Sequence, residues 1–170
     1  FVVDYRVRKI VVYDLLGNYH RTLKFSDDSY YNFIYNYDKN HLLVYKGYSP
    51  HKETENSGQI LISKKDGSIV REFQQPYSKV ATPVFTGMHE QYGEITLTPL
   101  YYLNFLVDDA WALTRPSCDT IYIYRDNAIP QPYIIRQPSV HSMSTQVFLY
   151  PLVDLKNHCF MFSQKKEVDM

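Results

Sequence analysis

The fold of this chain is decided by a stretch at residues 60–73, which reads ILISKKDGSIVREF. It opens with an apolar run, continues through the dipeptide Asp66-Gly67, and then places Ile69, Arg71 and Phe73 on one face of an extended segment. An Asp-Gly dipeptide between two such runs is a strong signal for a tight turn between antiparallel strands. The stretch therefore predicts a β-hairpin.

The same pattern recurs on both sides of this stretch. Roughly 50 residues earlier, residues 10–25 repeat it with a turn at Gly17, and roughly 60 residues later residues 121–133 repeat it with a turn at Asp126-Asn127. A second type of hairpin lies between these copies, at residues 35–43 and again at 105–113. Two alternating hairpin types form a repeated unit of four strands, which is typical of the blades of a β-propeller.

This period divides residues 1–170, taken as a single propeller segment, into about three four-stranded antiparallel blades. Residues 1–25 form the last strands of one blade, 31–73 and 97–135 form complete blades, and 146–170 begin another. Propellers close with about four to eight blades. We therefore expect either further blades in a longer protein or self-association of two copies. A two-sheet β-sandwich is the alternative fold, since short, regularly spaced strands suit it as well.

Composition limits the classes of function. The 170 residues carry 18 Lys+Arg and 18 Asp+Glu, so the net charge is zero and nothing favours binding to nucleic acid. Hydrophobic residues make up 45% and charged residues 21%, as in folded domains, and the 17 tyrosines favour strands. No run approaches the length of a transmembrane helix. Cys118 and Cys159 are expected to be free thiols, with Cys159 buried in an apolar run.

Two stretches of the sequence resemble a known protein family. The sequence VVYDLLGNYHRTLKF (residues 11–25) and the sequence LLVYKG followed by GQILISKKDGSIVREF (within residues 42–73) resemble six-bladed, NHL-like β-propeller proteins of gut-type bacteria. Those proteins are mostly uncharacterised, and many are lipoproteins. The resemblance implies an extracytoplasmic location, either periplasmic or on the cell surface, and a chain about twice as long. Its motif is a strand–turn–strand pattern, so it implies a fold and no particular chemistry.

Two long connections between expected strands are candidates for ligand binding. Loops longer than about 12–15 residues are usually functional or disordered. The segments 74–94 and 47–58 are both expected to be loops, and they mix aromatic, His and carboxylate side chains that suit a polar ligand. An ordinary solvated loop is the alternative interpretation. The candidate ligand-binding residues are Tyr77, His89, Glu90, Tyr92 and Glu94 in the first segment and His51 in the second.

Known catalytic and metal-binding patterns are missing from the sequence. The six histidines include no pair at zinc-ligand spacing, and neither a GxSxG nor a GxGxxG motif occurs. Asn32, Asn36 and Asn104 make a weak set of calcium ligands without a carboxylate. Ser139 and His141 are sequence neighbours, which does not make a catalytic triad. No metal site and no cofactor are expected.

These observations leave three hypotheses about function. The first is a non-catalytic binding or scaffold module whose ligand is a protein, a peptide or a glycan. The second is a metal-dependent enzyme of the lactonase or lyase type, which six-bladed propellers also include. The third is a purely structural part of a larger assembly. Fold alone does not decide among them.

Overall fold

The computed structural model describes residues 1–4, 6–25, 29–48, 53–97, 104–125, 129–155 and 158–167. Every regular element in these ranges is a β-strand, and every strand pairing is antiparallel. The all-β prediction is therefore confirmed. The chain divides into two compact units, one of residues 1–49 and 54–74 and the other of residues 50–53 and 75–170.

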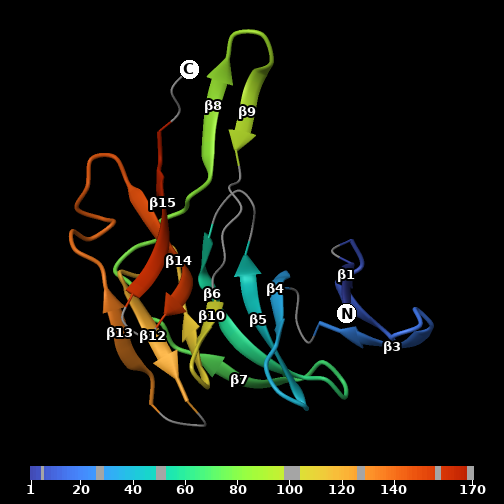
Figure 1. The fold of residues 1–170 in the computed structure, drawn as a ribbon. Helices are drawn as coiled ribbons and strands as arrows, with labels where there is room; N and C mark the ends of the chain where they lie inside the picture. The colour runs from blue at the N-terminus through green and yellow to red at the C-terminus, as the bar shows by residue number, and fades with distance from the viewer. Residues whose placement is uncertain are drawn as a thin grey trace. The chain divides into compact units, whose positions relative to one another are not determined.

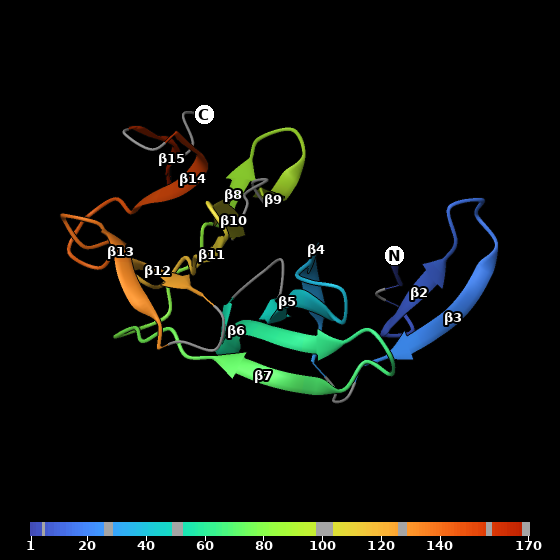
Figure 2. The ribbon, with the colours of Figure 1, turned by 60° about the horizontal axis from the view of Figure 1, so that its bottom comes forward.

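The first unit holds a three-stranded sheet in the order β1-β2-β3 and a four-stranded sheet in the order β4-β5-β6-β7. Figure 2 shows the long strand β6 beside β7. The bounds are β1 (Val2–Asp4), β2 (Lys9–Tyr13), β3 (Tyr19–Lys24), β4 (Tyr31–Asn36), β5 (His41–Tyr48), β6 (Glu53–Ser63) and β7 (Ile69–Phe73).

The turns of this unit follow from their Asp and Gly residues. Asp14 accepts hydrogen bonds from the backbone N–H groups of Leu16 and Asn18, both 2.9 Å long, and this closes the β2–β3 turn. Asp66 accepts from the backbone N–H of Ser68 in the β6–β7 turn. Short carboxylates that bond to the backbone two residues later are typical of tight turns. The turn chemistry read from the sequence is therefore what joins these strands.

Apolar side chains from both sheets form the core of the first unit. Alternation along β2 buries Ile10 and Val12, while β5 is buried on both faces. The rings of Phe25 and Tyr31 stack with centroids 4.1 Å apart. The core residues are Ile10, Val12, Leu23, Tyr31, Leu42, Val44, Ile60 and Ile62.

The second unit holds a four-stranded sheet, β10-β11-β12-β13, and two separate two-stranded sheets, β8-β9 and β14-β15. Figure 1 shows β8 and β9 as a ribbon of their own. The bounds are β8 (Phe85–His89), β9 (Gly93–Leu97), β10 (Asn104–Val107), β11 (Ala110–Leu113), β12 (Thr120–Tyr124), β13 (Gln131–Ile135), β14 (Val147–Leu155) and β15 (His158–Lys165).

The β14–β15 ribbon packs on one face of the β10–β13 sheet. Val107, Ala110, Ala112, Ile121 and Ile123 form the core on that face. Met161 of β15 packs against it, and β14 contacts β10. Small alanines on β11 let the second layer approach closely, as in the interior of any tightly packed domain.

Three expectations from the sequence are wrong. Segment 74–94 was expected to be one loop, yet it contains β8 and the turn into β9. Segment 47–58 was also expected to be a loop, but β5 continues to Tyr48 and β6 begins at Glu53. Cys159 is exposed, because it is the second residue of β15 and lies towards the end of the ribbon, away from the core residues that Met161 contacts. Both cysteines are free, as expected.

Candidate functional site

Four of the candidate binding residues lie together at the tip of the β8–β9 hairpin. His89 ends β8 and pairs with Gly93 at the start of β9, so residues 90–92 form a three-residue turn. Glu90 and Tyr92 lie in this turn, and Glu94 is the second residue of β9. We call His89, Glu90, Tyr92 and Glu94 the hairpin tip.

The hairpin tip presents an aromatic pair to solvent. The rings of His89 and Tyr92 lie with centroids 4.9 Å apart and planes inclined by 32°. The backbone N–H of Gln91 donates to His89 Nδ1 over 3.2 Å, which requires that nitrogen to be unprotonated. Tyr92 remains 70% exposed. The pair is thus held in place by local contacts while one ring stays available to a ligand.

Tyr77, a further candidate, is not at the hairpin tip. The guanidinium of Arg115 lies 3.8 Å from the ring centroid of Tyr77, and Arg115 is only 6% exposed. Cation–π contacts of this kind stabilise a buried arginine. Tyr77 therefore has a packing role in the structure. His51 lies outside the described residues.

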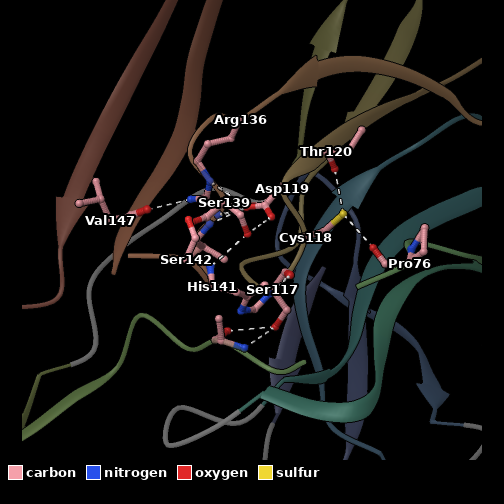
Figure 3. Close-up of polar contacts among 12 residues, drawn as sticks. Pro76, Ser117, Cys118, Asp119, Thr120, Arg136, Ser139, His141, Ser142 and Val147 are labelled. Atoms are coloured by element: carbon pink, nitrogen blue, oxygen red, sulfur yellow. Dashed lines mark hydrogen bonds and ion pairs between the residues drawn. The ribbon is translucent and has the colours of Figure 1, made fainter. Parts of the chain in front are cut away.

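A dense polar cluster, the Asp119 cluster, joins the residue before β12 to the segment after β13 (Figure 3). The Asp119 carboxylate accepts hydrogen bonds from Arg136 Nε and Nη2, from Ser139 Oγ and from the backbone N–H of Val140, at distances of 2.5–3.1 Å. Arg136 also donates through Nη1 to the carbonyl of Val147 over 2.8 Å. The cluster thereby ties the four-stranded sheet to β14.

The charge state of Asp119 follows from these contacts. Burial raises the pKa of this carboxyl, but the hydrogen bonds from Ser139, Val140 and Arg136, together with the charge of Arg136, outweigh burial and leave the pKa below its usual range. An ionised carboxylate whose pKa is lowered by four hydrogen-bond donors is a poor general base. The Asp119 cluster is therefore structural.

The hydroxyl and imidazole groups near the cluster do not form a nucleophile–base pair. Ser139 uses its hydroxyl proton on Asp119, and His141 Nε2 lies 2.9 Å from the carbonyl oxygen of Ser117, to which it must donate. Ser117 Oγ in turn bonds the backbone of Ala81 at both its N–H and its carbonyl. The bond from His141 to Ser117 fixes the segment after β13 against the segment before β12 (Figure 3).

An open groove in the second unit is the feature that sequence reasoning missed. It has a volume of about 870 Å³ and lies where β10 and β12 end, with β13 and the end of β14 at its sides. Tyr133 donates a hydrogen bond to Asp154 across it. The polar residues that line it are Asp108, Arg125, Gln131, Tyr133 and Asp154. They come from four separate strand ends, and no sequence motif links them.

Within the ranges that the structure describes, no group of three or more His, Cys, Asp or Glu side chains could hold a metal ion. In the same part of the chain, no helix is long and apolar enough to cross a membrane.

Comparisons with known proteins place the fold. No curated protein and no solved structure matches the chain. The model of one family, described as "6-bladed beta-propeller", matches residues 1–168. The four-stranded antiparallel sheets β4–β7 and β10–β13 are what the blades of such a fold require. The chain therefore belongs to this family of six-bladed β-propellers.

Proposed function

We propose that this protein is a non-catalytic binding module that recognises a protein or peptide through the hairpin tip. A β-propeller domain suggests a binding or scaffold role in general, and the hairpin tip is the observation that supports the more specific statement. It combines a ring that is 70% exposed with a neighbouring ring that fixes its position. A prepositioned aromatic side chain loses little entropy when it binds, and such residues dominate many interfaces.

The strands behind the tip support a peptide ligand. β8 and β9 pair with each other, and no other strand that the structure describes covers their outer edges. Extended peptides bind to exposed sheet edges through backbone hydrogen bonds, and neighbouring side chains supply selectivity. Glu90 and Glu94 flank Tyr92 and add negative charge, which favours a ligand segment containing Lys or Arg.

The test is peptide selection followed by measurement of affinity. A random peptide library is panned against the full chain, and the selected peptides are synthesised and titrated by calorimetry. We expect enriched basic peptides whose affinity falls about tenfold in the Tyr92→Ala variant. The matched control is Tyr19→Ala, since Tyr19 is also exposed but lies on β3.

Two results would overturn the proposal. One is the absence of any enriched peptide, and the other is a peptide that binds the Tyr92→Ala variant as well as the original chain. A panel of glycans is titrated in parallel. If glycans alone bind through Tyr92, the ligand is a glycan and the protein or peptide proposal is wrong.

We further propose that the protein acts outside the cytoplasm, in the periplasm or on the cell surface, as a lipid-anchored NHL-like propeller. The support is the resemblance of residues 11–25 and 42–73 to proteins of that kind. Fractionation of the native host cells, with protease treatment of intact cells, tests this proposal. Recovery of the protein only inside the cytoplasm contradicts it.

A further inference from the structure

We infer that the groove of the second unit is a binding site for a neutral oligosaccharide. The site is separate from the hairpin tip and does not depend on the function proposed for it. At about 870 Å³, its volume lies within the range of small-molecule sites, which is about 300–1,000 Å³.

Three polar side chains in the groove have no partner among the residues that the structure describes. Asp108, Arg125 and Gln131 line the groove and are exposed, and their side chains form no hydrogen bond or ion pair with the part of the chain that the structure describes. Asp108 and Arg125 carry opposite charges yet do not pair with each other. They supply a carboxylate, a guanidinium and an amide that a ligand can use.

A second pair of polar groups is fixed in position. Tyr133 donates its hydroxyl proton to the Asp154 carboxylate, which leaves the other Asp154 oxygen able to accept a further bond. The link joins β13 to β14 across the groove. One wall of the site is thus prepositioned, which reduces the ordering cost of binding.

The floor of the groove is apolar. Val107 and Ile123 line it and are 8% and 9% exposed, and the exposed Pro132 also lines the groove. Binding sites for small molecules typically combine such a floor with a few convergent polar groups. The C–H faces of a pyranose ring can pack on this floor while its hydroxyls reach the polar rim.

The chemistry of the rim selects a polyhydroxylated neutral ligand. Carboxylate, guanidinium and amide groups are planar and can each bond two adjacent hydroxyls, accepting from one or donating to another. With Asp108 and Asp154 against Arg125, the rim holds both signs of charge and a surplus of one negative charge. An anionic ligand meets repulsion there, whereas a neutral sugar uses both donors and acceptors.

The experiment is an NMR titration of the isotope-labelled full chain. The probes are neutral disaccharides and trisaccharides built from glucose, galactose or mannose, with the zwitterionic dipeptide Lys-Glu as a comparison ligand. We expect at least one saccharide to shift the side-chain signals of Gln131 and Arg125. Arg125→Met should weaken its affinity about tenfold, because a charge-assisted hydrogen bond is lost. Arg6→Met, on an exposed turn of the first unit, is the matched control.

Each possible result either supports or overturns the inference that the groove binds a saccharide. Saccharide binding that is lost in Arg125→Met and Gln131→Leu, and kept in Arg6→Met, supports the site. The inference is overturned if no saccharide binds, if the shifts lie away from the groove, or if only the dipeptide binds there. The dispersion of the backbone signals shows whether each variant remains folded. If no saccharide binds the groove, the proposal for the hairpin tip still stands, because its test measures peptide affinity and the effect of Tyr92→Ala.

Discussion

At the scale of single residues, two turn glycines have nearly the same backbone conformation but different surroundings. Gly17 has φ +85° with nothing near its missing side chain, whereas an added Cβ at Gly67, φ +83°, would lie 2.6 Å from the carbonyl oxygen of Lys24. Alanine in the left-handed region costs about 1–2 kcal/mol by itself. Gly67 is therefore needed both for the conformation of its turn and for the close approach of the β3 backbone.

This contrast predicts different costs for the same substitution. We expect Gly17→Ala to lower the free energy of unfolding by about 1 kcal/mol. We expect Gly67→Ala to lower it by about 3 kcal/mol, because the backbone of β3 must also move. Urea unfolding followed by circular dichroism measures both. Equal losses in the two variants would show that the contact with Lys24 adds no strain.

Asp119 makes stability depend on pH in a defined direction. Its pKa is lowered in the folded state, so its contribution to stability is complete above about pH 4, the ordinary value, and is lost as pH falls through the lowered folded pKa. We expect Asp119→Asn to cost about 2 kcal/mol at pH 7, because charge-assisted hydrogen bonds are lost. The difference from the original chain should shrink in unfolding curves recorded towards pH 3.

Asp109→Asn is the control for this measurement, since Asp109 is exposed and lies outside the Asp119 cluster. Its unfolding free energy should follow that of the original chain at every pH. A loss in Asp119→Asn that stays constant from pH 7 to pH 3 would contradict the assignment of an ionised, hydrogen-bonded Asp119.

At the scale of elements, the β8–β9 hairpin should be the least stable part of the described sheet structure. An isolated two-stranded hairpin is marginal in water, whereas β11 and β12 are paired on both sides. We expect the backbone amides of β8 and β9 to exchange with deuterium at least about tenfold faster than those of β11 and β12. Hydrogen exchange followed by mass spectrometry measures this, and equal protection would show that the hairpin packs against a further element.

Strand prediction from the sequence succeeded where apolar alternation and turn chemistry agree. The hairpins expected at residues 10–25 and 60–73 are present as β2–β3 and β6–β7. The sequence did not predict the β8–β9 hairpin, because β8 reads Phe-Thr-Gly-Met-His, with a glycine at its centre and only one β-branched residue. Its turn also lacks the Asn-Gly or Asp-Gly dipeptide that marks other turns.

At the scale of the whole molecule, the two kinds of candidate site differ in how far the sequence reveals them. The hairpin tip lies within six consecutive residues, so its aromatic and acidic content is visible in the sequence. The groove brings together side chains from Val107 to Leu155, whose proximity depends on sheet pairing and on the packing of β14. No local pattern encodes such a site, because long-range pairing alone creates it.

The β14–β15 ribbon carries a group of exposed apolar side chains on its two neighbouring strands. Met161 packs on the core, whereas its neighbours on β15, Phe160 and Phe162, are exposed, and Phe162 also stacks against the buried Tyr150 of β14. Val153 pairs with Phe160 across the ribbon, and these three side chains are 45–57% exposed. Contiguous exposed apolar surface of this kind marks an interaction face.

This face predicts self-association of the chain. We expect the weight-average mass in sedimentation velocity to rise with protein concentration, and Phe160→Lys to suppress that rise without changing the unfolding free energy by more than about 0.5 kcal/mol. Val70→Lys is the matched control, because Val70 is 54% exposed on β7, outside this ribbon. A mass that stays constant at all concentrations would contradict the prediction. A rise abolished by Val70→Lys but not by Phe160→Lys would place the contact on the first unit. Suppression by Phe160→Lys alone would identify the outer face of β14–β15 as the surface through which copies of this propeller segment meet.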